Sequence, residues 1–231
     1  MLKKKHIVVL SGAGISAESG LQTFRDSDGL WNGYDVYEVA TPGGFAKNPT
    51  LVLDFYNDRR RDVARAQPNA AHFGLANLEN HFAVTIITQN IDDLHERAGS
   101  TNVIHLHGQI FTMRSVADTT TIYGITGDIQ VGDLAADGQQ LRPNIVWFEE
   151  EVPMMELAIE ALKTADYFVV IGTSLQVYPA ASLLQYAPAV LPKFIIDKIN
   201  PVTNKYLNTT FIQEPATEGV AVLSSLLIKG L

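Results

Sequence analysis

The segment Ile7-Val8-Val9-Leu10-Ser11-Gly12-Ala13-Gly14-Ile15-Ser16-Ala17-Glu18-Ser19-Gly20 is an apolar run that passes directly into a glycine-rich stretch. Where a strand turns into a helix through glycines, backbone amides can cradle a phosphate. The spacing of Gly12, Gly14 and Ala17 is an allowed variant of the G-x-G-x-x-G dinucleotide fingerprint. The following Thr23-Phe24-Arg25 lies outside that fingerprint and suggests a loop folded over the ligand. The stretch therefore predicts a dinucleotide site at the end of a first strand.

Length and composition limit the class of protein. The chain has 231 residues, which suffices for one domain with a buried core, or for one large domain with a small insertion. The absence of cysteine excludes disulfides, thiolate zinc sites and cysteine nucleophiles, and it favours a cytoplasmic or otherwise redox-indifferent location. A net charge of −8 argues against nucleic acid as a partner, because nucleic-acid binders cluster Lys and Arg. No stretch approaches the roughly 20 apolar residues of a membrane span, so no membrane association is expected.

Strand-length apolar runs recur along the chain, at residues 6–11, 82–87, 103–106, 167–171 and 194–196. Near-continuous hydrophobic runs of this kind are typical of central parallel strands that are covered on both faces. Helical spacing of apolar residues between the runs indicates helices over 49–66, 70–80 and 154–165, the first and last opened by Pro49 and Pro153. This alternation predicts an α/β fold with a doubly wound parallel sheet.

One segment breaks the rhythm. Residues 113–141 are rich in Thr, Asp, Gly and Gln, with short alternating stretches such as Thr120-Thr121-Ile122-Tyr123. The segment is interpreted as a small β-rich insertion between core elements.

Polar residues follow the apolar runs, at Gln89-Asn90-Ile91-Asp92, His107, Gly172-Thr173-Ser174 and Asn200. The carboxyl ends of parallel strands meet at one edge of a sheet, so these loops are expected to form one crevice with the glycine loop. Taken alone, Gln89-Asn90-Ile91-Asp92 is equally consistent with a helix cap.

Two histidines lie on the same side of the run that begins at Val103. Residues there alternate with period two, so Ile104 and Leu106 face one way, and His105 and His107 the other. His107 comes last before a glycine, at the strand end, where a general base would have to lie. His105 is assigned the commoner, structural role.

Six ordered motifs resemble those of the sirtuins, the NAD-dependent protein-lysine deacylases, and in particular the bacterial class III branch. They are Gly12 to Gly20 with Thr23-Phe24-Arg25, Thr-Gln-Asn-Ile-Asp-Asp-Leu-His from Thr88, His105-Leu106-His107-Gly108, Val146-Trp147-Phe148, Gly172-Thr173-Ser174, and Ile199-Asn200. Because the motifs keep this order over nearly the whole chain, the resemblance is highly specific.

The resemblance implies a fold and a reaction. A large Rossmann-type domain would cover about residues 1–30, 70–112 and 142–231, and a small inserted domain about 31–69 and 113–141. NAD, as a co-substrate, would meet an acyl-lysine protein or peptide in the cleft between them. In that family the acyl oxygen attacks C1′ of the nicotinamide ribose, nicotinamide leaves, and a histidine base activates a ribose hydroxyl, so that O-acyl-ADP-ribose is released.

The resemblance also implies residue roles. His107 would be the base, Asn90 would position the ribose and the catalytic water, and Asp92 would hold the nicotinamide carboxamide. Phe24 would cover the reacting face. Further NAD contacts would come from Gly12, Ala13, Gly14, Ser16, Glu18, Thr23, Arg25, Trp31, Gln89, Gly172, Thr173, Ser174, Asn200 and Ala216. The peptide would contact Val146, Trp147 and Phe148.

A narrower resemblance concerns the acyl group. Tyr56 and Arg59 form the Tyr-x-x-Arg pattern of the sirtuin branch that prefers malonyl- and succinyl-lysine. Positions i and i+3 share a helix face, so the hydroxyl and the guanidinium can converge on one carboxylate. The alternative is that Arg59, Arg60 and Arg61 form a solvated basic face paired with nearby acids, and this is the interpretation for Arg60 and Arg61.

The chain departs from the family in its small domain. Most sirtuins hold this domain together with a zinc ion on two pairs of cysteines, but here Ser115 stands near the first expected position and no cysteine is present. No zinc is therefore expected. The small domain would depend on its strand pairing and on apolar residues such as Ile122 and Leu134.

A second departure follows Val146-Trp147-Phe148. The family usually has Gly-Glu there, and this chain has Glu149-Glu150-Glu151. In the family this stretch pairs with the substrate backbone as an added strand. Loss of the glycine is expected to alter the path of that strand, and the three acids to favour peptides with basic flanks.

The leading hypothesis is NAD-dependent removal of acetyl, and of succinyl or malonyl, groups from protein lysines. Mono-ADP-ribosyl transfer would use the same NAD site and stays open as an alternative. A hydride-transfer dehydrogenase is disfavoured by the asparagine and histidine motifs, and a non-catalytic NAD or ADP-ribose sensor is disfavoured because His107 is present. No motif indicates an oligomeric state.

Overall fold

Six parallel strands form the central sheet of the computed structural model, which describes residues 3–22, 30–31, 33–201 and 207–230. In spatial order these strands are β11 (Thr209–Ile212), β10 (Lys193–Ile196), β9 (Tyr167–Ile171), β1 (His6–Ser11), β4 (Ala83–Thr88) and β5 (Val103–His105). All five apolar runs that the sequence marks as strands lie in this sheet, which confirms the predicted α/β fold. β11 was not predicted.

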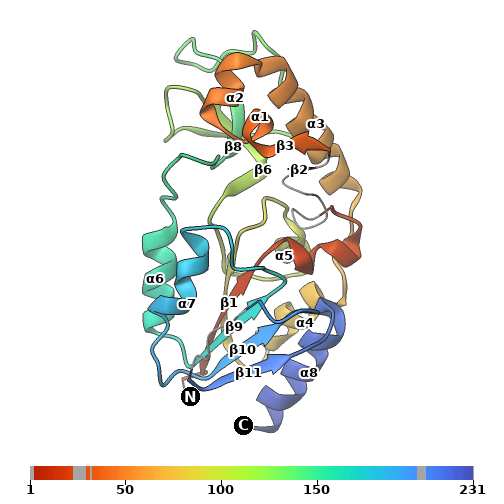
Figure 1. Ribbon diagram of the computed structural model, residues 1–231, viewed down its shortest axis with the longest axis vertical. Coiled ribbons are helices and arrows are strands. Elements are labelled where there is room, and N and C mark those ends of the chain that lie inside the picture. Colours follow the sequence, from red (N-terminus) through yellow and green to blue (C-terminus); the bar gives the residue numbers. More distant parts are fainter. Residues whose placement is uncertain (1–2, 23–29, 32, 202–206, 231) are drawn as a thin grey trace.

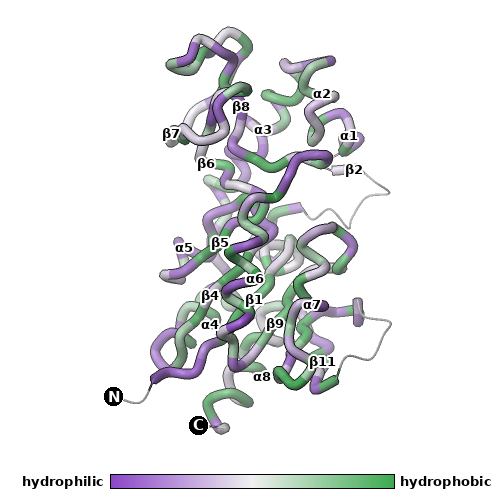
Figure 2. The backbone as a smooth tube through the Cα atoms, turned by 90° about the vertical axis from the view of Figure 1, so that its left-hand side faces the viewer, coloured by the Kyte–Doolittle hydropathy of each residue, from purple (hydrophilic) through white to green (hydrophobic). Residues whose placement is uncertain are grey.

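The strands at the centre of the sheet are buried on both faces. Ile7, Val8, Val9 and Leu10 of β1 have no exposed surface, and alternate residues contribute to two separate hydrophobic clusters. One cluster lies under α4 (Ala70–Leu78) and α8 (Ala216–Lys229), and the other under α6 (Met155–Lys163) and α7 (Leu183–Tyr186). Figure 1 shows these helix pairs on opposite sides of the sheet, and Figure 2 shows the hydrophobic stretches at β1, β4 and β9.

Local signals set the helix ends. α3 (Pro49–Arg65) has proline in its first turn, and the side chain of Asn48 accepts a hydrogen bond from the Leu51 amide at 3.1 Å. α6 begins at Met155 rather than Met154, so Pro153 precedes the N-cap instead of occupying the first turn. α8, which the sequence analysis did not assign, follows Pro215. No helix in the described ranges is long and apolar enough to cross a membrane.

A smaller unit stands at the end of the molecule where the parallel strands have their carboxyl ends (Figure 1). It contains the three-stranded antiparallel sheet β7-β6-β8, with β6 at Gly108–Ser115, β7 at Ile122–Gly124 and β8 at Leu141–Ile145. Helices α1 (Val36–Val39), α2 (Pro42–Lys47) and α3 and the short pair β2 (Leu30–Trp31) and β3 (Tyr34–Asp35) complete it. The sheet extends beyond residues 113–141 at both ends, and the exact division into two domains stays a prediction.

Short helical segments connect the remaining elements. They are η1 (Ala13–Ile15), η2 (Ala17–Ser19), α5 (Leu94–Arg97) and η4 (Ala180–Ser182).

The prediction that Ile122 and Leu134 form the apolar core of the small unit is wrong. Ile122 and Leu134 are 44% and 59% exposed, so neither is part of a core. One buried cluster consists instead of Leu53, Ile129 and Leu141, from α3, the loop after β7 and β8, and a larger one includes Val39, Phe55 and Ile110. Short edge strands alternate inward and outward residues, and Ile122 falls on the outward side.

Two polar side chains of α3 connect the helix to the rest of the small unit. Asn57 donates to the carbonyl oxygen of Ile129 at 2.9 Å and accepts from the Ile129 amide at 3.0 Å. Arg60 donates to the carbonyl oxygens of Ile110 at 2.9 Å and of Gly127 at 3.0 Å, and to Asn57 Oδ1 at 2.8 Å. The solvated role expected for Arg60 is therefore wrong, since its side chain is buried in this cluster. Arg61 is exposed and pairs with Asp58 and Asp128.

We expect Arg60→Met to lower the free energy of unfolding by about 3 kcal/mol, because it leaves buried carbonyl oxygens without their charged donor. Urea denaturation measures the change. Arg61→Met is the matched control on the next residue and should cost much less stability, since its ion pairs are exposed. Equal losses in the two variants would contradict a special role for Arg60.

Candidate active site

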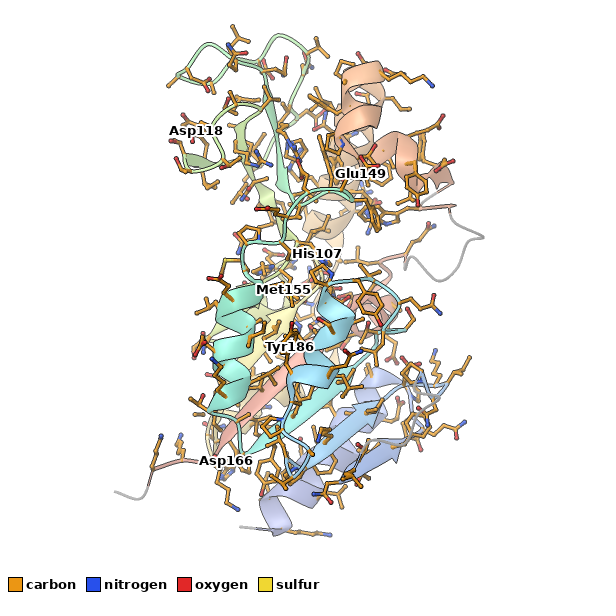
Figure 3. All side chains as sticks on the ribbon, turned by 60° about the vertical axis from the view of Figure 1, so that its left-hand side comes forward. His107, Asp118, Glu149, Met155, Asp166 and Tyr186 are labelled. Carbon is orange, nitrogen blue, oxygen red and sulfur yellow. The ribbon has the colours of Figure 1, made fainter. Side chains whose placement is uncertain are left out.

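A cavity of about 500 Å³ lies between the end of the parallel sheet and the small unit. Its walls include the loops after β1, β4, β5, β9 and β10, so the strand ends meet in one crevice as predicted. The opposite wall comes from α3 and the segment after β8. Figure 3 shows His107 between the sheet and the small unit, and Glu149 on the side of the small unit. The volume is within the range of sites for small organic ligands and cofactors.

The glycine loop touches the loop after β9 backbone to backbone. The Gly14 amide donates to the carbonyl oxygen of Gly172 at 2.8 Å, and the Gly12 amide donates to that of Ile171 at 3.0 Å. A Cβ atom on Gly14 would lie 2.7 Å from the Cα atom of Gly172, so a larger residue would force the two loops apart. Because the glycines have no side chains, backbone atoms form this part of the cavity wall, and a phosphate can approach them closely.

Ser16 connects the glycine loop to the loop after β4. Its hydroxyl donates to Asp92 Oδ2 at 3.0 Å and accepts from Asn90 Nδ2 at 3.1 Å. The other Asp92 oxygen accepts from the Leu94 amide at 3.2 Å. Burial raises the pKa of Asp92, and the two hydrogen bonds offset part of that rise. The network fixes the Asn90 amide and the Asp92 carboxyl on one side of the cavity.

His107 has a defined tautomer. Its Nδ1 lies 3.0 Å from the carbonyl oxygen of Gln89, which can only accept, so Nδ1 carries the proton and Nε2 has a free lone pair. Burial lowers the pKa of His107, and the hydrogen bond to Gln89 offsets part of that effect. The Gln89 side chain in turn donates to Thr173 Oγ1 at 3.0 Å. A neutral imidazole with an available nitrogen suits a general base.

His105 is held within the protein. Its Nε2 lies 2.6 Å from Glu96 Oε1, and its Nδ1 lies 3.2 Å from the carbonyl oxygen of Asn90. Both ring nitrogens are thus engaged by protein atoms, which agrees with the structural role assigned from the sequence.

Tyr56 and Arg59 of α3 line the cavity with unsatisfied polar atoms. The Tyr56 hydroxyl and Arg59 Nε are buried and have no hydrogen-bond partner among the described residues. The guanidinium carbon of Arg59 lies 5.5 Å from the centre of the Trp31 ring, in a cation–π contact. Burial raises the pKa of Tyr56 and lowers that of Arg59. A polar ligand or ordered water can complete the hydrogen bonds of buried groups of this kind.

The segment Val146 to Phe148 uses its amides within the protein. The Val146 amide donates to the carbonyl oxygen of His107 and the Phe148 amide to that of Ala40, both at 3.0 Å. The Trp147 amide donates to Glu150 Oε2 at 2.8 Å. Pairing with a substrate backbone, which stays a prediction, would therefore have to use carbonyl oxygens of this segment rather than these three amides.

Glu149 adopts a left-handed backbone conformation. Its φ angle is 73°, in the left-handed region that favours glycine. Glu150 forms contacts with Arg142 and Trp147, whereas Glu149 and Glu151 are exposed. The segment thus has backbone strain at Glu149, two of its three acids lie on the surface, and a changed path of the strand stays a prediction.

The cavity brings together nearly all the described residues that the sequence assigned to a site. Its lining includes Gly12, Ala13, Gly14, Ser16, Glu18, Trp31, Tyr56, Arg59, Gln89, Asn90, Asp92, His107, Val146, Trp147, Phe148, Gly172, Thr173, Ser174 and Ala216. Asn200 is exposed and is not among the lining residues. Thr23, Phe24 and Arg25 lie outside the described residues. The role of each residue stays a prediction.

Several residues of the cavity wall were not predicted from the sequence. Leu21, Val63 and Ile91 add apolar surface near Tyr56, while Asp197, Lys198 and Glu214 add charge beyond β10 and before α8. Ile91 stands inside the motif Gln89 to Asp92 and was the easiest to find. The others have no local motif and are recognised only when the fold is known.

Residues 12–179 match the Sir2 family, the family of the sirtuins. The chain belongs to this family. An NAD-dependent protein deacylase of Helicobacter pylori is 52% identical over 97% of this chain and 98% of its own length. A protein of the same name from Bacteroides thetaiotaomicron is 48% identical over 97% of this chain and 98% of its own.

Solved structures of Sir2 proteins share the fold. A Sir2 homologue in complex with NAD superposes with a TM-score of 0.86 and 37% identity, covering 98% of this chain and 91% of that one. A Sir2 protein bound to acetylated peptide gives a TM-score of 0.79 and 29% identity, covering 96% of this chain and 93% of that one. The Rossmann-type sheet predicted from the sequence is thus the sheet of the Sir2 family.

We expect Glu149→Gly to stabilise this sirtuin by about 0.5–1 kcal/mol. Release of the left-handed conformation gains about 1–2 kcal/mol, and the greater freedom of the unfolded chain removes about 0.4–1 kcal/mol of it. Urea denaturation measures the change. Glu151→Gly is the matched control, because Glu151 has no positive φ angle, and it should lose stability. A loss in both variants would contradict strain at Glu149.

Proposed function

We propose that this sirtuin is an NAD-dependent protein deacylase, which removes acyl groups from lysine side chains and releases nicotinamide and O-acyl-ADP-ribose. The observation that carries the proposal is the single cavity that joins the glycine loop, His107 and the Tyr56–Arg59 pair. Relatives of about half identity over nearly the whole chain have the same name, and a Sir2 neighbour binds acetylated peptide. Acyl-lysine proteins or peptides are therefore the proposed partners.

The residues of the cavity fit NAD as the co-substrate. Gly12, Gly14 and Gly172 line the cavity with backbone that a diphosphate can approach, and the hydroxyls of Thr173 and Ser174 can contact it. Asn90 and Asp92, fixed by Ser16, present an amide and a carboxyl for the ribose and the carboxamide. Bound NAD would supply an electrophilic ribose carbon and nicotinamide as the leaving group. The chain has no cysteine, so no thiolate zinc site supports this chemistry.

His107 is the proposed general base. The carbonyl oxygen of Gln89 holds the proton on Nδ1, so that Nε2 can take a proton from a ribose hydroxyl. A pKa lowered by burial keeps the imidazole neutral near pH 7. Asn90 orients the sugar, and the apolar walls from Ile91 and Trp147 help to exclude water.

The Tyr56–Arg59 pair is proposed to bind acyl groups that end in a carboxylate, such as succinyl and malonyl. A carboxylate between these side chains would accept a hydrogen bond from the Tyr56 hydroxyl and from Arg59 Nε, which are buried without partners. Charge-assisted hydrogen bonds of this kind are strong in a buried site. An acetyl group would leave both donors unsatisfied.

Product analysis tests the function. Mass spectrometry would follow NAD incubated with acetyl-lysine and succinyl-lysine peptides. Nicotinamide with O-acyl-ADP-ribose and deacylated peptide is the expected result. ADP-ribosylated protein without deacylated peptide would instead indicate mono-ADP-ribosyl transfer, and unchanged NAD would contradict both activities.

We expect His107→Ala to lower kcat by about 100-fold or more, the usual contribution of a general base, while the Kd for NAD changes little. Calorimetry with NAD and peptide turnover measure the two effects. In the unsubstituted enzyme, kcat/KM should rise with pH to a plateau, because the base works when deprotonated. The burial-lowered pKa of His107 places the midpoint of that rise below the usual pH of about 6.5. Retained turnover in the variant would exclude His107 as the base.

We expect Arg59→Met to raise the KM for succinyl-lysine peptide about tenfold or more, because it removes a charge-assisted hydrogen bond to the acyl carboxylate. The KM for the matched acetyl-lysine peptide should change by no more than about twofold. Steady-state kinetics with the two peptides measures the difference. An equal change for both would show that Arg59 supports the cavity without selecting the acyl group.

A further inference from the structure

Arg142 of β8 is buried beside Trp147, which lines the cavity. Its Nη1 donates to Glu150 Oε1 at 2.6 Å, and its Nη2 donates to Glu150 Oε2 at 3.1 Å, a two-point contact. Nη2 also donates to the carbonyl oxygen of Ile145 at 2.8 Å. The residue is only 4% exposed. Arg142 thus joins both ends of the segment from Ile145 to Glu150.

The same guanidinium stacks on Trp147. Its central carbon lies 3.2 Å from the centre of the indole ring, much closer than the upper limit of about 6 Å for a cation–π contact. Glu150 holds the Trp147 backbone as well, by accepting its amide hydrogen at 2.8 Å. Side chain and backbone of Trp147 are therefore fixed by the two members of one ion pair, in which the Arg142 side chain is buried and that of Glu150 is partly buried.

Trp147 is the point at which this ion pair reaches the cavity. The indole lines the cavity and lies 6.3 Å from the ring centre of Tyr56. Its Nε1 is buried and has no partner among the described residues, as is the case for the Tyr56 hydroxyl. The next residue before it, Val146, bonds to the backbone of His107. The orientation of this indole therefore shapes the wall between the acyl-binding pair and the proposed base.

We propose that Arg142, held by Glu150, is a positioning residue that sets the orientation of the Trp147 indole and thereby the binding of the acyl-lysine substrate. The effect on substrate rests on the proposed deacylase function, whereas the effect on the indole does not. A lysine at this position would keep the positive charge but would lack the planar face and the two-point contact. Arg142→Lys therefore separates the effect of the positive charge from the effect of stacking on the indole.

The experiment compares Arg142→Lys with the unsubstituted enzyme. The KM for an acyl-lysine peptide should rise about tenfold, since the stacked and desolvated contact is lost, while the KM for NAD stays within about twofold. The near-ultraviolet circular dichroism of Trp147 is the second readout. It is recorded in Trp31→Phe protein, because the chain has only two tryptophans. This signal should change in the Arg142→Lys protein.

A second variant provides the test if the Arg142→Lys protein does not fold. Glu150→Gln keeps an oxygen for the Trp147 amide but removes the charge opposite Arg142, and it should shift the same two readouts in the same direction by a smaller amount. Arg61→Met, which removes an exposed arginine with two ion pairs, is the control and should shift neither.

The outcomes separate the two proposals. An unchanged peptide KM and an unchanged Trp147 signal in Arg142→Lys or, if that protein does not fold, in Glu150→Gln would overturn the positioning role. Equal rises in KM for peptide and NAD would also overturn it. If the unsubstituted enzyme turns over no acyl-lysine peptide, the deacylase proposal fails, and the Trp147 signal still decides whether Arg142 orients the indole.

Discussion

The close approach of the Gly14 and Gly172 backbones is the constraint on which the site depends. β1 and β9 are neighbours in the sheet, so the loops that follow them leave the sheet side by side. The 2.8 Å hydrogen bond between these loops forms because no Cβ atom separates them. Ser16 is then placed to bind Asp92 and Asn90, which belong to the loop after β4 on the other side of β1. Three strand ends are thereby combined into one wall.

Helix α3 both lines the cavity and holds the small unit together. Tyr56 and Arg59 are three residues apart and line the cavity, while Asn57 and Arg60 are also three apart and bind the loop after β7 and the start of β6. A helix advances by 3.6 residues per turn, so the two pairs lie on adjacent faces. The polar contacts of Asn57 and Arg60 hold a unit for which a cysteine zinc site is impossible. They also fix the face that carries Tyr56 and Arg59, the proposed acyl-binding pair.

The sequence was sufficient for the sheet and for most of the cavity wall, because buried parallel strands and the loops at their ends have local signals. It was not sufficient where burial depends on distant partners. Arg59, Arg60 and Arg61 point in directions about 100° apart on the helix, and only the packing of β6 and of the loop after β7 decides that Arg60 is buried. Ile122 and Leu134 look like core residues, yet both are exposed, Ile122 at the start of the short strand β7 and Leu134 in an isolated bridge outside the named strands. The sequence around Arg142 gives no signal for its contacts. Glu150 reaches Arg142 only because the chain turns at Glu149.

The three glutamates after Phe148 do not form one uniform patch of negative charge. The negative charge of Glu150 is paired with the positive charge of Arg142, and Glu150 accepts a hydrogen bond from the Trp147 amide. Glu149 occupies a conformation that favours glycine, so the turn that brings Glu150 back under Trp147 is made in spite of the side chain rather than because of it. The charge that a peptide with basic flanks would meet is therefore that of Glu149 and Glu151 alone. Since exposed charges act mainly on encounter and are screened by salt, such a preference would be modest and would weaken at high ionic strength.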